Sequence, residues 1–269
     1  MIKVTLSFDD GRKDNYRVAN EILAPMQLPA TFNITTDYVS GKEARGIPCA
    51  NQAMNKEEVV NLSRNALIEI AGHGKSHHNG FVNLMDGVKE LKEWCGLDKM
   101  GIASPNSQLS EKELQRERGR YKKNEICYVR IGVRCLHRTF IKRCLRKINK
   151  QIHSGKISSW VCRESLLSKE DNYILNSIPV LHYNTLDEVK KIINDAVETD
   201  KSCILMFHSI LKEGEDFYRD LWSWDYEQFR RLCVFLKEME EKKMLQVSKT
   251  MDIVNNICEM EQKRGETGL

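Results

Sequence analysis

The chain has 269 residues, of which 41% are hydrophobic and 30% are charged, so one large globular domain or two small ones can bury a substantial core. No apolar run approaches the roughly 18 residues of a membrane span, and no signal-peptide pattern precedes the first hydrophobic strand. These features argue against a membrane-spanning protein and predict a cytoplasmic one.

Strand and helix patterns alternate along the chain, and no repeat, low-complexity tract or flexible linker separates them. The expected strands are Ile2–Phe8, Thr31–Ile34, Ile68–Ala71, Met100–Ala103, Ile126–Ile131, Ile157–Val161, Tyr173–Ser177, Ser202–Phe207 and Leu245–Ser248. The expected helices are Asn15–Leu23, Lys56–Arg64, Asn83–Trp94, Glu111–Tyr121, Thr139–Gln151, Thr185–Glu198 and Asp225–Lys242. This alternation predicts a mostly parallel sheet or barrel covered by helices, with its chemistry at the carboxyl ends of the strands.

Two adjacent carboxylates, Asp9 and Asp10, follow the first predicted strand. Burial and like-charge repulsion raise the pKa of at least one such carboxyl unless a metal ion or a proton compensates. Histidines follow two later strands, His73 with His77 in one case and His208 in the other. Because the carboxyl ends of parallel strands share one rim, we expect these five side chains to converge on a metal ion.

At these residues the chain resembles the polysaccharide deacetylase family, the NodB-homology carbohydrate esterases of family 4. The similar segments, in the family's order, are Ser7–Gly11, Leu28–Ile34, Glu69–His77, Leu205–His208 and Gln246–Thr250. The resemblance spans most of the chain and implies an α/β fold, a distorted (β/α) barrel that binds one divalent metal ion. The implied activity is removal of acetyl groups from sugars.

The resemblance also implies roles for the converging side chains. Asp10, His73 and His77 would be the metal ligands, which fits the three N/O ligands and open position of a catalytic zinc site. Asp9 would be the general base that deprotonates the metal-bound water, and His208 the general acid for the leaving amine or alkoxide. Zn²⁺ is the expected ion, although Co²⁺, Ni²⁺, Mn²⁺ or Fe²⁺ suits the same open site.

The spacing of the two histidines suits one face of a helix, but the glycines around them argue against a helix. Gly72 and Gly74 flank His73, and they favour an irregular loop in which the backbone crowds the ion. We expect Ser76 to brace this loop locally.

The third motif of the family is altered here. The segment Ala103–Ser107 lacks the arginine that orients the base in the family pattern. Arg130 and Arg163 are candidates to replace it, although ordinary surface charge is the favoured interpretation of each. Pro105 and Asn106 are expected to contact the substrate, with a backbone N–H near Asn106 helping to stabilise the oxyanion.

Other residues near the predicted rim leave alternatives open. Trp222 is expected either to stack on a sugar or to anchor the helix that follows it, and Trp224 suits the anchor better. No residue that braces His208 is evident, and His78 is interpreted as exposed. The remaining histidines, interpreted as structural or exposed, are His137, His153 and His182.

The net charge of +4 conceals a strong asymmetry. Residues 111–156 carry 15 Lys or Arg and 4 Asp or Glu, a local charge of +11, which leaves −7 for the rest. Within this basic segment Arg138–Lys150 predicts an amphipathic helix whose apolar face comprises Phe140, Ile141, Cys144, Leu145 and Ile148. We favour docking of this face on the core over contact with a phosphate-bearing carrier or a membrane surface.

The nine cysteines are odd in number and show no CxxC spacing, so they are interpreted as reduced and mostly buried. They are Cys49, Cys95, Cys127, Cys135, Cys144, Cys162, Cys203, Cys233 and Cys258.

The sequence thus predicts a single deacetylase domain over residues 1–256, with a basic helical insertion at about 111–156 and a polar tail at 257–269. The expected substrate is an N- or O-acetylated carbohydrate or glycoconjugate intermediate, and a peripheral contact with the inner membrane surface is a further expectation. The alternative is an inactive NodB-like fold that binds a glycan or a nucleic acid. Nucleic-acid binding is disfavoured because no recognised motif for it is present.

Overall fold

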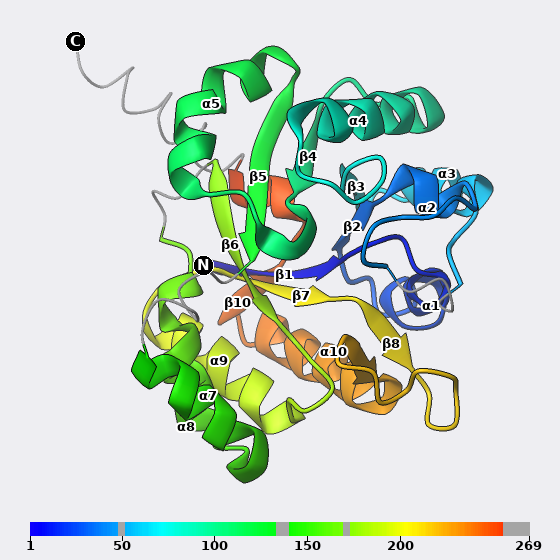
Figure 1. Ribbon diagram of the computed structural model, residues 1–269. Helices are drawn as coiled ribbons and strands as arrows, with labels where there is room; N and C mark the ends of the chain where they lie inside the picture. The colour runs from blue at the N-terminus through cyan, green and yellow to red at the C-terminus, as the bar shows by residue number, and fades with distance from the viewer. Residues whose placement is uncertain (48–51, 133–139, 169–172, 255–269) are drawn as a thin grey trace.

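The computed structural model describes residues 1–47, 52–132, 140–168 and 173–254 and shows a parallel β-barrel enclosed by helices (Figure 1). The barrel strands are β1 (Ile2–Phe8), β2 (Ala30–Ile34), β3 (Ile68–Gly72), β4 (Met100–Ala103), β5 (Ile126–Gly132), β6 (Ile174–Pro179) and β7 (Cys203–Phe207). Each strand pairs in parallel with the next, and β7 pairs with β1, so the barrel closes. The predicted parallel α/β barrel is therefore confirmed.

The first strand sits at the junction that closes the barrel. Residues 4–8 of β1 pair with β7 along one edge. The other edge is shared, since residues 2–4 pair with β10 (Leu245–Val247) and residues 7 and 8 pair with β2. Because β2 and β10 diverge from this edge, the sheet opens at the start of β1, where β10 pairs with it.

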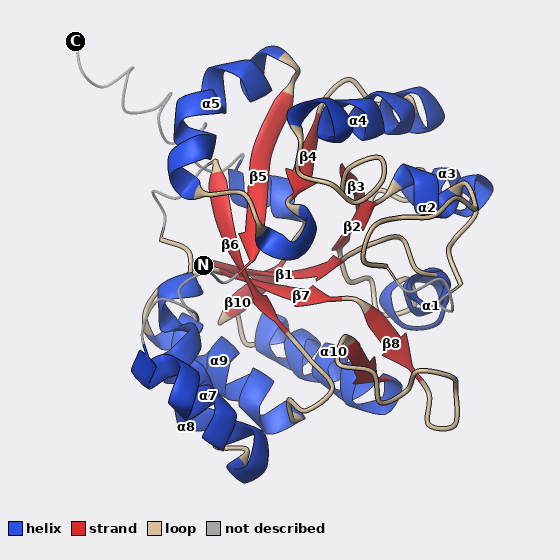
Figure 2. Cartoon of the chain, viewed as in Figure 1, coloured by secondary structure: helices blue, strands red, loops and turns tan. Residues whose placement is uncertain are grey.

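Helices cover the outside of the barrel (Figure 2). They are α1 (Lys13–Val18), which continues as a π-helical turn (Ala19–Leu23), α2 (Thr36–Val39), α3 (Lys56–Ser63), α4 (Phe81–Cys95), α5 (Glu111–Lys123), α7 (Phe140–Ile152), α8 (Gly155–Cys162), α9 (Leu186–Glu198) and α10 (Tyr226–Glu241). Two short strands, β8 (Ser209–Leu211) and β9 (Ser223–Asp225), form a separate pair. Within the described ranges, every helix is too short or too polar to span a bilayer.

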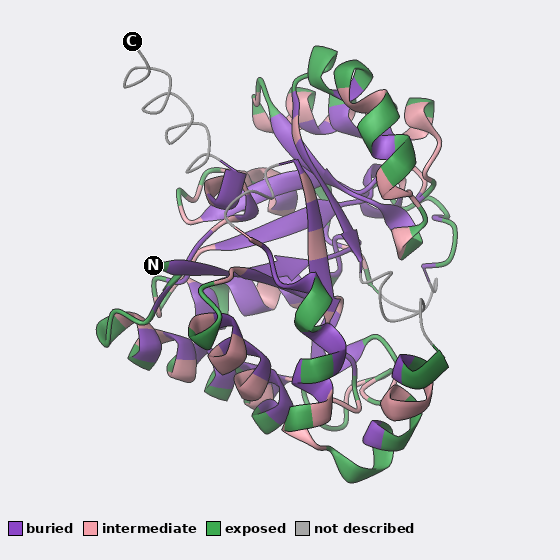
Figure 3. Cartoon of the chain, turned by 90° about the vertical axis from the view of Figure 1, so that its left-hand side faces the viewer, coloured by how far each residue is buried: buried purple, intermediate pink, exposed green. Residues whose placement is uncertain are grey.

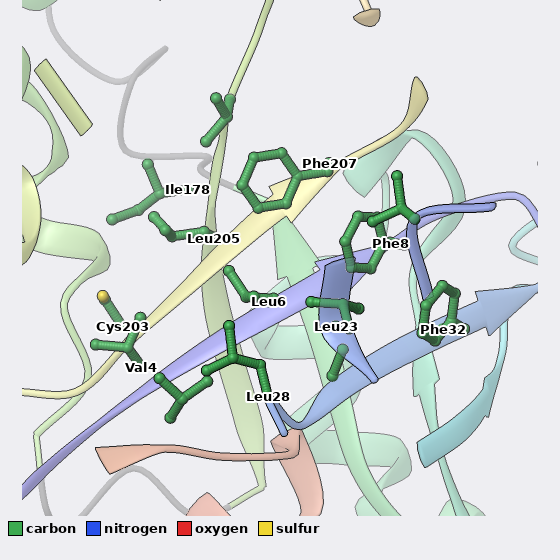
Figure 4. Packing of buried hydrophobic residues seen from close by; sticks show 14 of the residues in the cluster. Val4, Leu6, Phe8, Leu23, Leu28, Phe32, Ile178, Cys203, Leu205 and Phe207 are labelled. Carbon is green, nitrogen blue, oxygen red and sulfur yellow. The ribbon is translucent and has the colours of Figure 1, made fainter. Parts of the chain in front are cut away.

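The core lies largely between the strands and these helices, and the strands are mostly buried while the outer helix surfaces are exposed (Figure 3). Along β1, apolar Leu6 and Phe8 alternate with polar side chains, as expected for a strand whose two faces differ. The ring of Phe8 stacks on Phe32 and Phe207, with centroids 4.9 and 5.5 Å apart (Figure 4). It also meets the ring of Phe229 of α10 edge-on. This packing fixes the end of β1, which carries the two aspartates.

Two predictions about the region of α7 and α8 are wrong. The predicted strand Ile157–Val161 lies inside α8, where Ser158, Val161 and Cys162 are buried on one helical face. The β-branched residues of this segment suggested a strand. The segment forms a helix because its buried side chains are spaced three and four residues apart.

The second error concerns α7, which begins within one residue of the predicted helix. Most of its apolar face does not dock on the core, because Phe140, Ile141 and Ile148 are 81%, 64% and 50% exposed. Leu145 of the same face does pack against the core. Lys142 and Asn149 are buried instead.

Six cysteines lie in the described residues, and these six form no disulfide with one another. Other predictions fall outside the described residues. They concern Cys49, Cys135, His137, Cys258 and the tail 257–269.

Candidate metal centre

Three of the predicted ligands meet at the carboxyl ends of β1 and β3. One ligand atom each from Asp10, His73 and His77 lies within 4.8 Å of the other two, and all three residues are buried. Among the described residues this is the group of His, Cys, Asp and Glu side chains whose geometry suits a metal ion. The predicted convergence of these side chains is therefore observed.

The turn after β1 sends the two carboxylates toward different partners. The N–H of Asp9 still donates to Phe207 O at 2.9 Å, which continues the barrel pairing. Asp10 then adopts a φ of 76° and Gly11 a φ of 92°. Aspartate tolerates this left-handed conformation better than most residues, and at Gly11 an added Cβ would lie 3.1 Å from Val39. The chain therefore reverses sharply at the mouth of the barrel.

Each histidine is oriented by a backbone carbonyl. The Nδ1 of His73 lies 3.0 Å from Ala103 O, and the Nδ1 of His77 lies 2.5 Å from Arg45 O. Since a carbonyl only accepts, each Nδ1 donates to its carbonyl, and Nε2 is the ring nitrogen left to face a metal ion. Burial also lowers the pKa of His73 to about 4, so this imidazole is neutral at neutral pH. Both rings have the form that a metal ligand requires.

The loop between these histidines is irregular, as predicted from its glycines. Gly74 has a φ of 80°, and a Cβ there would lie 3.0 Å from the Asn83 side chain. The Nδ2 of Asn83 donates to Ser76 Oγ at 2.8 Å, and Asn83 Oδ1 accepts the N–H of Ser76 at 3.3 Å. Ser76 therefore braces the loop together with Asn83 at the start of α4.

A buried arginine holds Asp10 in place. Arg12 directs its Nε and Nη2 at Asp10 Oδ2, at 2.9 and 2.8 Å. The other oxygen, Oδ1, has no hydrogen-bond partner in the described residues and lies 3.6 Å from Nε2 of both His73 and His77. Burial opposes ionisation of this carboxyl, but Arg12 and the nearby histidines hold its pKa below the ordinary value. An ionised, unpartnered oxygen facing two free imidazole nitrogens fits a divalent cation.

Asp9 has its own arginine. Nη2 of Arg130 lies 2.5 and 2.7 Å from the two oxygens of Asp9, and Asn33 Nδ2 donates to Oδ1 at 2.9 Å. Burial alone would raise the pKa of Asp9, but Arg130 and the histidines keep it below its ordinary value. Interpretation of Arg130 as surface charge is wrong, since it is 1% exposed. Arg163 is exposed, so it is Arg130 that orients Asp9.

His208 follows β7, and its ring lies 4.5 Å from that of Trp222, centroid to centroid. Burial lowers the pKa of His208, although Asp10 and Asp9 oppose the shift. Its Nδ1 has no hydrogen-bond partner among the described residues, so no bracing residue is identified. Trp222 is 37% exposed, whereas Trp224 is 1% exposed and its Nε1 donates to Asn184 O at 2.8 Å. The anchoring role therefore falls to Trp224, and Trp222 is left facing solvent beside His208.

Two other predicted residues follow β4. Pro105 is buried, and its carbonyl accepts from Asn79 Nδ2 at 2.7 Å. Asn106 is exposed with a φ of 49°, and its side chain approaches the same point above Gly46 as the His77 ring. Asn106 therefore lies near the metal ligands, and substrate contact by Pro105 and Asn106 stays a prediction.

The remaining histidines behave as interpreted. His78, His153 and His182 are all exposed. None of them belongs to the group of candidate ligands.

Some residues of the site were missed from the sequence. Arg12 and Asn33 were not singled out, although each carried a signal. Two buried carboxylates require compensating charge, and Arg12 is the nearest cation in the chain. Asn33 is an amide between the apolar Phe32 and Ile34 of a predicted strand.

The comparison with protein families gives one match. The model of the polysaccharide deacetylase family matches residues 2–123, a range that contains Asp9, Asp10, His73 and His77. This match confirms the resemblance that the sequence motifs indicate. No curated protein matches the chain.

Solved structures also resemble the chain. A candidate polysaccharide deacetylase from Mycobacterium smegmatis aligns with a TM-score of 0.60 at 12% identity, over 97% of this chain and 91% of that one, which confirms the fold. A family 4 acetyl xylan esterase from Clostridium thermocellum in complex with a cobalt ion aligns at 0.49 and 13% identity, over 94% and 90%. The BpsB deacetylase domain from Bordetella bronchiseptica aligns with a TM-score of 0.40 at 15% identity. This alignment covers 47% of the present chain and only 62% of the BpsB domain.

Proposed function

Given the match of residues 2–123 to the polysaccharide deacetylase family, we propose that the chain is a metal-dependent hydrolase that removes an acetyl group from a carbohydrate or glycoconjugate. One observation carries the proposal. The unpartnered Oδ1 of Asp10 faces the free Nε2 atoms of His73 and His77, beside the Asp9–Arg130 pair and His208. A protein that only binds a ligand would not need both the carboxylate of Asp9 and the imidazole of His208 beside the metal site.

The ligands proposed for the ion are Asp10, His73 and His77. Their mixed nitrogen and oxygen set favours Zn²⁺, and Co²⁺, Ni²⁺, Mn²⁺ or Fe²⁺ would suit the same donors. A divalent ion bound there would polarise the acyl carbonyl and lower the pKa of a water molecule to about 7. Arg12 keeps Asp10 Oδ1 turned toward the two imidazoles.

Asp9 is the proposed general base. Because Arg130 and the histidines hold its pKa down, its carboxylate is ionised at neutral pH and ready to accept a proton. Arg130 and Asn33 fix the orientation of the carboxylate. Because the pairing with Arg130 lowers the pKa of Asp9, Asp9 is a weaker base than an ordinary aspartate. The pKa of the attacking water must therefore also be lowered before Asp9 can take its proton.

His208 is the proposed general acid. Burial lowers the pKa of its imidazole, so a proton that it holds during the reaction is readily given to the leaving amine or alkoxide. The ring of Trp222, next to His208, offers an exposed flat surface on which a sugar can stack. Pro105 and Asn106 would complete the opposite side of the substrate site.

Finer features of the function remain proposals based on the sequence. A single catalytic domain over residues 1–256 and a cytoplasmic location would direct the enzyme to a soluble or carrier-linked intermediate. The altered third motif and the +11 charge of residues 111–156 are the support for an inactive binding module. Arg130 occupies the orienting position next to Asp9, so we prefer the hydrolase.

Bound metal per chain tests the proposal. We expect about one equivalent of divalent metal after back-titration of the wild type, and little in His73→Ala. His78→Ala is the matched control, because His78 is exposed in the same loop and should leave metal content unchanged.

Activity forms the second part of this test. Acetate release from acetylated sugars should fall at least about a hundredfold in Asp9→Asn, with metal content retained. Two results would contradict the proposed function: metal binding that is absent or unaffected by His73→Ala, and full activity in Asp9→Asn.

A further inference from the structure

Helix α7 presents an apolar face to solvent. Phe140, Ile141, Ile148 and Ile152 are 81%, 64%, 50% and 56% exposed. Ile141, Ile148 and Ile152 are spaced at i, i+7 and i+11, so they form one stripe along the helix. A contiguous apolar stripe on an exposed helix usually marks a surface that binds something.

Polar anchors about 100° around the helix axis from the isoleucine stripe fix this orientation. Asn149 Nδ2 donates to Ser158 Oγ at 2.7 Å and to Glu188 Oε1 at 2.5 Å. Lys142, seven residues earlier on the same side, is buried, and its Nζ lies 2.6 Å from Glu164. Rotation of α7 to bury the isoleucines would break these contacts and expose Asn149, so the outward apolar stripe is a specified feature of the fold.

A cationic stripe lies on the other side of the helix from the apolar one. Arg143, Lys147 and Lys150 are exposed and spaced at i, i+4 and i+7. The helix Phe140–Ile152 contains no acidic residue. Figure 1 shows α7 with α8 on the outside of the molecule, next to α9. The exposed surface of α7 therefore combines an apolar stripe and a cationic stripe of similar length.

We propose that α7 binds the surface of an anionic lipid bilayer, with the isoleucine stripe inserted at the acyl boundary and the cationic stripe on the headgroups. Charge complementarity selects this partner, because helices with isoleucine or phenylalanine on one side and lysine or arginine on the other lie in the membrane interface. A nucleic acid would contact the cations and leave the isoleucines uncovered. The inference is independent of the proposed hydrolase activity.

Vesicle flotation of the full chain tests this binding. We compare vesicles of phosphatidylcholine alone with vesicles that also contain phosphatidylglycerol. The wild type should float with the anionic vesicles, and about 0.5 M NaCl should reduce the bound fraction because salt screens the headgroup charges. The variant Ile141→Glu/Ile148→Glu should lower the partition coefficient by about tenfold or more.

Two further variants separate the contributions. Arg143→Glu/Lys147→Glu should weaken binding to anionic vesicles by at least about tenfold through the lost attraction. Val82→Glu is the matched control, since Val82 is 67% exposed on α4, away from α7, and should bind as the wild type does. Thermal unfolding and metal content of each variant establish that the fold is intact.

Several outcomes would overturn the proposal. They are equal partition of the wild type into neutral and anionic vesicles, and unchanged binding of Ile141→Glu/Ile148→Glu. Binding that appears only after removal of residues 255–269 would assign the stripe to that segment of the chain. A wild-type dimer that does not float and that Ile148→Glu converts to a monomer would assign the stripe to a second copy.

Discussion

At the scale of single residues, the centre is organised as two carboxylate–arginine pairs. Asp9 pairs with Arg130, and Asp10 pairs with Arg12, all four being at most 2% exposed. Formal charges cancel within each pair, so the adjacent carboxylates stay ionised without a proton. The sequence argument that such carboxylates need compensation was correct, but it assigned all of that compensation to a metal or a proton. A divalent ion would therefore add its charge to a site that is already balanced.

Arg12 is predicted to act on metal affinity through the orientation of Asp10. Arg12→Lys keeps the positive charge but loses the fork that holds Oδ2, so Oδ1 should turn away from the histidines. Zinc affinity should fall by about tenfold or more, as for other residues that orient a ligand. Competition with a chromogenic chelator measures this change. Arg163→Lys is the control because Arg163 is exposed, and equal affinities in both variants would refute the positioning role.

Asp14 is predicted to make stability depend on pH. Burial raises its pKa from 3.8 to about 6, although its Oδ2 accepts the N–H of Ile210 at 2.6 Å. The folded state then holds a proton that the unfolded state releases, so this contribution to stability is full below about pH 4 and is lost as pH rises toward 6.

Asp14→Asn removes the titration and can still accept the bond from Ile210. Since Asp14 is half-buried, we expect the variant to gain on the order of 1 kcal/mol relative to wild type between pH 4 and pH 7. Urea unfolding at both pH values measures the difference. A constant offset between variant and wild type across this range would count against the raised pKa.

The strand-end residues were predictable because they lie at the ends of readable strands. Asp9, Asp10, His73, His77 and His208 each directly follow, or lie a few residues beyond, a run whose pattern identifies a strand. The partners of these residues were harder to predict. Arg130 is 121 residues from Asp9 in sequence, and their contact exists only because the barrel places the two strands across from each other.

At the scale of secondary-structure elements, local pattern worked for the barrel and failed for α7 and α8. The barrel strands match prediction within two residues at each end, because their apolar runs are short and bounded by turns. In α7 the pattern identified the helix but not the side that docks. That choice depends on a polar cluster of Asn149, Ser158 and Glu188 from three helices, which no local pattern reveals.

The buried cluster is predicted to hold α7 and α8 on the barrel. Asn149→Ala would remove the bonds to Ser158 and Glu188 and leave the N–H of Ser154 without its acceptor, at a cost of about 1–3 kcal/mol. Urea unfolding measures the cost, and hydrogen exchange should show faster opening of α7. Lys147→Ala, on the exposed side of the same helix, controls for helix propensity. Equal stability of the two variants would mean that the cluster does not anchor the helix.

At the scale of the whole molecule, a buried polar network closes the end of the barrel at which the strands begin. Glu69, near the start of β3, accepts from Tyr128 Oη at 2.7 Å, Thr31 Oγ1 at 2.9 Å and the N–H of Met251 at 2.9 Å. The N–H of Thr250 donates to Thr31 Oγ1 at 2.9 Å. Burial raises the pKa of Glu69, which lies at the opposite end of β3 from His73. The segment after β10 thus covers the end of the barrel that is remote from the metal centre.

Closure of this end also depends on a glycine. A Cβ on Gly101 of β4 would lie 1.9 Å from the ring of Tyr128 in β5. The pairing of β4 with β5 shifts register between Met100 and Ile102, because an extra residue of β5 is accommodated there. Gly101 therefore gives the Tyr128 ring room inside the barrel, where its hydroxyl reaches Glu69.

Gly101→Ala is accordingly predicted to destabilise the whole barrel. The methyl group cannot fit unless the Tyr128 ring or the β4 backbone moves, and such overpacking costs about 1–3 kcal/mol. Gly119→Ala is the matched control, since Gly119 lies in α5 with no atom within 4 Å of an added Cβ, and it should gain about 0.5–1 kcal/mol. Urea unfolding of both variants gives the comparison.

Zinc affinity of folded Gly101→Ala should stay near that of wild type, because the strain lies at the end of the barrel away from Asp10, His73 and His77. An unchanged free energy of unfolding in Gly101→Ala would show that Tyr128 does not depend on this space. An unchanged free energy of unfolding together with lost zinc binding would show that the two ends of the barrel are coupled.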